Sequence, residues 1–226
     1  MKLFGTRKGL VAARQSLLFS EAALRASGEH VVQAEALAAV LTTWGAVWQA
    51  RQDADDALAR ANARVAWCSY SLDRVIKRLA NELLRDTGGK SEHPVFRAFF
   101  PEAPSTVVKL ALEAKLERCA DFAVVASRRV PGEGALAALK AIEAAMREGQ
   151  AALKQRRDAE QARTSAGLDA ASWRNAADAT RQSVALQLQA WALANDEARS
   201  YAARFFPSEV SRQGAEGEAS QEADEG

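Results

Sequence analysis

The sequence predicts an all-α protein of long antiparallel helices, a helical bundle with coiled-coil character and an internal duplication. Apolar residues recur at alternating steps of four and three over long stretches that contain no proline, and no period-two run of β-branched residues indicates a strand. The tripeptide Phe-Phe-Pro begins at Phe99 and again 106 residues later at Phe205, and each copy ends a similar series of predicted elements. These observations predict the fold class.

Two helices are predicted in the first part of the chain. The first runs from about residue 10 to residue 26 and is closed by a Ser-Gly pair, a common C-terminal stop. The second shows the clearest pattern, from Leu37 to Leu83, where a heptad repeat continues without proline. It predicts one helix of about 50 residues, or roughly 75 Å. Breaker residues from 86 to 94 end it.

The second part of the chain repeats this order. A short helical turn at 94–100 stops at a proline, and a helix capped by Ser105 is expected to run to about Arg129. After a Pro-Gly break, a very long helix is predicted from 135 to 206, with a kink possible at either of its two internal glycines.

The repeated order predicts two homologous units. We expect a first helical repeat at 1–103, a second at 104–213 and a disordered acidic tail at 214–226. The segment from Arg51 aligns with the segment from Arg156, and Trp67 aligns with Trp173, so the two tryptophans are expected in equivalent environments. The alternative is a chance similarity between helices rich in alanine and arginine.

The apolar face of the first long helix is a candidate interaction surface, which we call the seam. The second long helix covers it poorly, because from Leu153 to Val184 it has few large apolar residues. Part of the seam is therefore predicted to bind another subunit, in a twofold dimer or a hetero-assembly. The seam residues are Leu37, Leu41, Trp44, Trp48, Leu72, Ile76, Leu79 and Leu83.

The middle of both long helices is polar, and we call this region the polar waist. Salt bridges there could fix the register of the bundle, as polar seam residues do in coiled coils. A ligand-binding or enzymatic groove is the alternative. The residues of the polar waist are Arg51, Asp55, Arg156, Arg157 and Glu160.

The residues that enzymes and metal sites require are scarce. Only two histidines occur, no Glu-x-x-His motif lies on a predicted helix, and no glycine loop has the spacing of a phosphate-binding loop. We therefore predict no enzymatic activity, cofactor, metal or small-molecule substrate. Cys68 and Cys119 are widely spaced, which is typical of reduced thiols and indicates a cytoplasmic location.

The charge pattern disfavours nucleic acid as a partner but leaves it open as an alternative. The formal net charge is +1, and a basic stripe of helical spacing lacks interleaved aromatic residues and is interrupted by Asp73 and Glu82. A solvated helix face is the favoured interpretation. The stripe consists of Arg74, Lys77, Arg78 and Arg85.

No run approaches 18 apolar residues, so no membrane span is expected. Basic residues interrupt any signal-peptide core near the N-terminus, although a targeting role for this basic segment stays open. The phenylalanines of both Phe-Phe-Pro sequences are expected to dock on the bundle. Together, these patterns predict a non-enzymatic helical structural or protein–protein interaction component of a homo- or hetero-oligomer.

Overall fold

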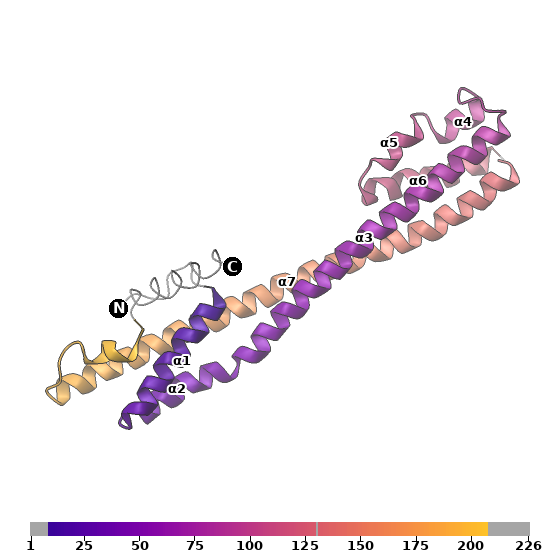
Figure 1. The fold of residues 1–226 in the computed structure, drawn as a ribbon. Helices are drawn as coiled ribbons and strands as arrows, with labels where there is room; N and C mark the ends of the chain where they lie inside the picture. The colour runs from indigo at the N-terminus through magenta and orange to yellow at the C-terminus, as the bar shows by residue number, and fades with distance from the viewer. Residues whose placement is uncertain (1–8, 130, 208–226) are drawn as a thin grey trace, which may run out of the picture. The chain divides into compact units, whose positions relative to one another are not determined.

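The computed structural model describes residues 9–129 and 131–207, and within them the predicted all-α class is confirmed. These residues are 85% helical and include no strand (Figure 1). The predicted acidic tail and the basic residues 1–8 lie outside the described residues.

Seven α-helices and one 3₁₀-helix make up the described chain (Figure 1). They are α1 (Leu10–Ser27), α2 (Val31–Thr42), α3 (Trp44–Asp86), α4 (Pro94–Phe99), α5 (Pro104–Val108), α6 (Leu112–Arg128), α7 (Glu133–Ala194) and η1 (Tyr201–Phe205). As predicted, α1 ends at a glycine: Gly28 has a φ of 73°, a left-handed conformation that favours glycine.

Helix boundaries differ from the prediction in three places. The first long helix is divided at Thr43, where two consecutive threonines and a nearby glycine lower helix propensity. The predicted helix from Ser105 is two helices, α5 and α6, and the N-cap of α5 is Ala103 rather than Ser105. Finally, α7 ends at Ala194 rather than near 206, and Asp196 beyond it has a positive φ of 56°.

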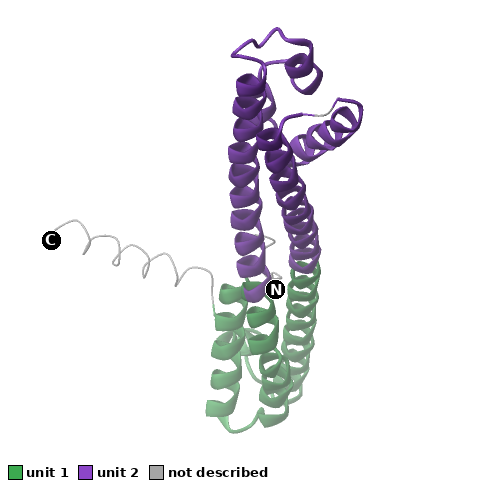
Figure 2. Cartoon of the chain, turned by 90° about the vertical axis from the view of Figure 1, so that its right-hand side faces the viewer, with its two compact units in different colours: residues 1–52, 165–226 green, residues 53–164 purple. Residues whose placement is uncertain are grey.

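The chain divides into two compact units (Figure 2). Unit 1 contains residues 1–52 and 165–226, and unit 2 contains residues 53–164. The long helices α3 and α7 therefore contribute to both units, and the expected boundary between repeats, after residue 103, falls within unit 2.

In unit 1, a hairpin of α1 and α2 packs with the end of α7 and with η1. His30 is buried at the turn of the hairpin, and its Nε2 lies 2.9 Å from the hydroxyl oxygen of Tyr201. The rings of Trp191 and Phe205 contact the imidazole edge to face. This aromatic cluster joins η1 to the hairpin.

In unit 2, the second half of α3, the first half of α7, α4 and α6 share one core. Helix α6 approaches α7 closely at Gly149, where an added Cβ would lie 3.1 Å from a methyl carbon of Leu116. This glycine was expected to mark a possible kink, yet α7 continues through it. Its small size instead permits close packing of the two helices.

Both phenylalanine pairs are buried, as the sequence predicted. Phe99 and Phe100 lie in the core of unit 2, and Phe100 contacts the ring of Phe122 with centroids 5.2 Å apart. Phe205 and Phe206 lie in the core of unit 1. Each Phe-Phe-Pro sequence thus anchors the segment that follows a long helix.

The two tryptophans expected to be equivalent are not. The side chain of Trp67 is 62% exposed, whereas that of Trp173 is 5% exposed. The residue of α3 that lies 105 positions before Trp173 is Cys68, and it is buried. Aligning the tryptophans shifts the helices by one residue, which rotates a helix by about 100°.

Candidate functional site

Much of the seam is buried within the chain itself. Leu37, Leu72, Ile76, Leu79 and Leu83 are completely buried. These residues are covered within their own chain, and the expectation that part of the seam is left for another subunit applies to its other residues. The sequence pattern indicated α7 alone as the helix that covers the seam. In the structure, α1 in unit 1 and α4 and α6 in unit 2 supply additional apolar side chains.

The partly exposed seam residues lie together in unit 1. Trp44 stacks on Trp48 with ring centroids 5.5 Å apart, and it contacts Trp173 of α7 at 4.8 Å. The guanidinium of Arg14 lies over the Trp44 ring at 5.9 Å. Leu41, also partly buried, packs against the same core. The seam is therefore most accessible where α2 meets α3.

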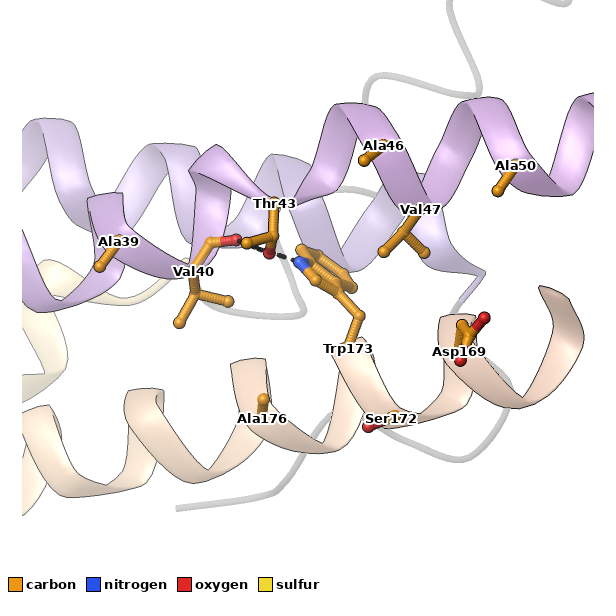
Figure 3. A pocket seen from close by; sticks show the side chains of 10 residues that line it. All are labelled: Ala39, Val40, Thr43, Ala46, Val47, Ala50, Asp169, Ser172, Trp173 and Ala176. Atoms are coloured by element: carbon orange, nitrogen blue, oxygen red, sulfur yellow. Dashed lines mark hydrogen bonds between the residues drawn. The ribbon is translucent and has the colours of Figure 1, made fainter. Parts of the chain in front are cut away.

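Beside these tryptophans, unit 1 has an open groove of about 700 Å³ between α7 and the junction of α2 with α3 (Figure 3). We call it the α2–α7 groove. Most of its walls are alanine and valine, and Asp169 is the one ionisable residue that lines it. Its lining residues are Ala39, Val40, Thr43, Ala46, Val47, Ala50, Asp169, Ser172, Trp173 and Ala176.

A hydrogen bond holds the side chain of Trp173 in place where it lines this groove. Its Nε1 donates a hydrogen bond to the carbonyl oxygen of Val40, with 3.1 Å between the two atoms (Figure 3). The hydroxyl of Thr43 donates to the same oxygen at 2.9 Å. Carbonyls at a helix C-terminus lack partners within the helix, and these side chains supply them where α2 ends.

The α2–α3 region is also the most apolar part of the described chain. Within residues 31–86, one window of 18 residues is long and apolar enough to cross a membrane, and 17% of it is buried. A mostly buried core helix of a soluble protein and a signal sequence near the N-terminus can meet the same criterion, so length and composition do not by themselves indicate a span.

The polar waist forms ion pairs, but mostly with residues outside the predicted set. Asp55 of α3 accepts a hydrogen bond from Arg163 of α7 at 2.7 Å. Arg156 pairs with Glu113 of α6 at 2.8 Å and with Glu160 at 3.5 Å. These charges therefore connect α3 with α7 and α6 with α7 within unit 2.

A buried ion pair in unit 2 was not predicted. The Nζ of Lys115 lies 2.6 Å from Oδ1 of Asp73 and donates to the Ser69 hydroxyl at 2.8 Å. The Lys115 side chain is only 3% exposed. The sequence does contain an indication that Lys115 is buried, because it lies within the apolar stripe of α6 that Leu112 and Leu116 define.

Cys68 and Cys119 are free and buried in unit 2, as expected of reduced thiols. Burial is the main cause that raises the pKa of Cys119 to about 12, and burial likewise raises the pKa of Cys68. Because the thiolate is the nucleophile, both thiols should be inert in the folded protein.

We expect Cys119 in native protein to react with an aromatic disulfide reagent at pH 8 at least about a thousandfold more slowly than in unfolded protein, since burial raises its pKa to about 12 and an unfolded thiol has a pKa of about 8.5. The measurement is the release of coloured thiolate with and without guanidinium chloride. Rapid modification of one thiol in the native state would show that unit 2 opens readily.

Among the residues that the structure describes, no group of three or more His, Cys, Asp or Glu side chains could hold a metal ion. The comparisons with known proteins identify no family: no family model, curated protein or solved structure matches this chain.

Proposed function

We propose that this chain is a non-enzymatic helical interaction component that assembles with itself through unit 1. The supporting observation is the stretch from residue 36 to residue 50, which contains no charged side chain although Leu37 is the only one of its residues that is buried. Helices exposed to water normally carry charged residues on the exposed face. An uncharged stretch that is only partly buried is typical of an interface.

The occupant of the α2–α7 groove that we propose is a second copy of residues 36–50. The groove has a single carboxylate on one side and is otherwise uncharged, so it suits a helix that carries no charge. Its alanines and Thr43 leave space for the backbone of a second helix to come close. In a twofold dimer each copy would offer both the helix and the groove, which makes the contact self-complementary.

The ligand-binding alternative through the polar waist is less well supported. Asp55 and Arg156 are engaged by Arg163 and Glu113, so a ligand would have to displace existing ion pairs. Fixing the register of α3, α6 and α7 accounts for these contacts without a ligand.

We also infer that the chain arose by internal duplication, with an interval of 105 residues in the long helices. Pairs of residues at this interval are buried in both helices: Ala54 and Ala159, Ala61 and Ala166, Cys68 and Trp173, Leu72 and Ala177, Leu79 and Val184, Leu83 and Leu188. A crystal structure in which burial does not repeat at this interval would contradict the duplication.

The self-association proposal is tested by substituting Ala46 with glutamate. Ala46 is exposed, so the fold should be retained, whereas a carboxylate in the dimer contact would lose its hydration. We expect the dimer dissociation constant to rise at least tenfold, which corresponds to about 1.4 kcal/mol. Sedimentation equilibrium over a concentration series measures it.

Ala57→Glu is the matched control, because Ala57 is an exposed alanine of α3 outside the groove. Equal weakening by both substitutions would indicate a general charge effect and argue against this contact. Circular dichroism should be the same for both variants.

A further inference from the structure

We infer that the exposed face of α3 in unit 2 binds single-stranded nucleic acid. Trp67 and Tyr70 are 62% and 54% exposed, and their ring centroids are 5.8 Å apart. Arg74, Lys77 and Arg78 follow at steps of three and four residues, which places all five on one face of the helix. We call this set the aromatic–basic face.

The structure removes both objections that the sequence raised to such a surface. The first was that aromatic residues were missing from the basic stripe. They lie on the N-terminal side of the stripe, at positions 67 and 70, and are exposed on the same face. The sequence alone did not show that these rings point to solvent, because Trp and Tyr are more often partly buried.

The second objection was that Asp73 and Glu82 interrupt the positive charge. The carboxylate of Asp73 pairs with the buried Lys115, with 2.6 Å between Oδ1 and Nζ. Glu82 pairs with Arg85 on its own helix. Both carboxylates are therefore already neutralised, and the three cations of the face have no hydrogen-bond or ion-pair partner among the described residues.

The chain contains an internal comparison for this face. At the interval of 105 residues, the corresponding exposed positions of α7 are Ser172, Asn175, Ala179, Gln182 and Ser183. At these five positions α7 is exposed to solvent without aromatic or cationic side chains. The aromatic–basic face is consequently a specific property of α3 and not a general feature of its solvated surface.

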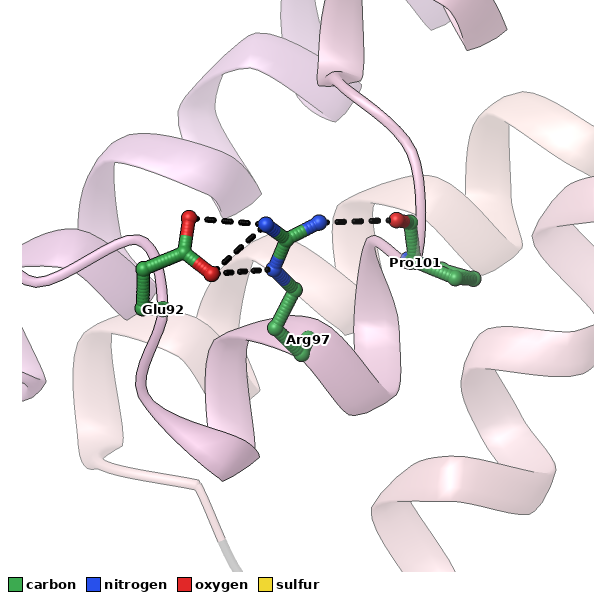
Figure 4. A network of polar contacts seen from close by, with 3 residues as sticks. All are labelled: Glu92, Arg97 and Pro101. Atoms are coloured by element: carbon green, nitrogen blue, oxygen red, sulfur yellow. Dashed lines mark hydrogen bonds and ion pairs between the residues drawn. The ribbon is translucent and has the colours of Figure 1, made fainter.

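A cavity of about 390 Å³ adjoins the C-terminal end of this face. Lys77 and Asn81 of α3 line it together with the rings of Phe96 and Phe100. Arg97, which also lines it, is occupied: it binds both carboxylate oxygens of Glu92 and donates to the carbonyl oxygen of Pro101 at 3.0 Å (Figure 4). Lys77 is therefore the cation lining this cavity that remains available to a phosphate, and Glu102 is the carboxylate that lines it without a described partner.

These features match the chemistry of single-stranded nucleic acid. Unpaired bases stack on exposed aromatic rings, and the phosphates between them bind to arginine and lysine. A duplex offers no free base faces to Trp67 and Tyr70, so single strands should bind more tightly than duplexes. The net charge of +1 does not oppose this, because the attraction is local to the face.

The test is fluorescence anisotropy of the full chain with a labelled single-stranded oligonucleotide of mixed sequence, as DNA and as RNA, against the matching duplex. Three phosphate contacts predict that the affinity falls about 20-fold between 50 and 200 mM salt. Trp67→Ser, which introduces the residue found at position 172, should weaken binding about tenfold and leave the salt dependence unchanged.

Charge-removing variants should behave differently. In Arg74→Gln combined with Arg78→Gln, the salt dependence should fall to that of about one phosphate contact. All of the substituted side chains are exposed, so circular dichroism should be unchanged. Arg157→Gln, an exposed arginine of α7, and Phe19→Ser, an exposed aromatic of α1, are the matched controls and should bind as the wild type does.

Three results would overturn the inference. One is the absence of oligonucleotide binding at the lower salt concentration. Another is equal loss of binding in Arg157→Gln and in the Arg74/Arg78 variant, which would indicate attraction to charge in general. The third is sedimentation with anionic phospholipid vesicles that depends on Trp67 while no oligonucleotide binds, which would assign the face to a membrane surface. None of these results depends on self-association through unit 1.

Discussion

Substitution of Asp73 with alanine is expected to destabilise the protein by about 3–5 kcal/mol, because it leaves the ammonium of Lys115 buried without a counter-ion. Lys115 is 3% exposed and its Nζ would retain only the Ser69 hydroxyl, a neutral partner. The free energy of unfolding is measured by urea denaturation, followed by circular dichroism at pH 7.

Two further variants show whether the effect arises from the unpaired charge. Asp73→Leu combined with Lys115→Met removes both charges and should lie within about 1 kcal/mol of the wild type, or be more stable. Asp121→Ala breaks the exposed pair with Arg118 and should cost less than about 1 kcal/mol. If Asp73→Ala lowered the free energy of unfolding as little as Asp121→Ala, Lys115 would not be confined to the core.

Phe100→Ala is also expected to lower the free energy of unfolding by about 3–5 kcal/mol, the range for replacing a buried phenylalanine with alanine. Phe100 is 1% exposed and lies between the rings of Phe96 and Phe122, with centroids at 5.5 and 5.2 Å. Its loss would leave a cavity between α4 and α6 that these rings cannot fill. Urea denaturation again measures the change.

Phe19→Ala is the matched control, because Phe19 is half exposed on α1 and its removal creates no enclosed cavity. It should change the free energy of unfolding by less than about 0.5 kcal/mol. A small effect of Phe100→Ala would contradict the docking of the first Phe-Phe-Pro sequence in the core of unit 2.

The sequence predicted the helices well where a long periodic pattern met a strong stop signal. The C-terminus of α1 at Gly28 and the short helix before Pro101 are examples. It did not predict the division at Thr43, because β-branched residues and Gly45 lower helix propensity only slightly. In the folded chain, Trp173 and Thr43 supply donors to the Val40 carbonyl, and these tertiary contacts stabilise the break.

The candidate surfaces could be predicted only in part. The heptad pattern identified the buried face of α3, but it could not tell which other elements would cover that face. Helix α6 was predicted, yet its role as a cover for Leu72 and Ile76 depends on long-range packing. For the same reason the sequence places Asp73 among the surface charges, because its partner Lys115 lies on another helix.

The exposure of the aromatic–basic face likewise could not be predicted from the sequence alone. A helical pattern gives the relative directions of Trp67, Tyr70 and Arg74, but the direction of solvent is known only once the covering helices are placed. The interval of the proposed duplication also mattered, since the match of the two tryptophans at 106 residues predicted equivalent environments for Trp67 and Trp173, which differ in exposure. At an interval of 105 residues the α3 residue that precedes Trp173 is Cys68, and both are buried.

The mass of the unmodified protein in solution tests the proposed function most directly. The chain has a mass of 24.3 kDa. Light scattering at tens of micromolar should give about twice this value for the wild type and for Ala57→Glu, and a value closer to the monomer for Ala46→Glu. A monomeric wild type at that concentration would contradict self-association through the α2–α7 groove.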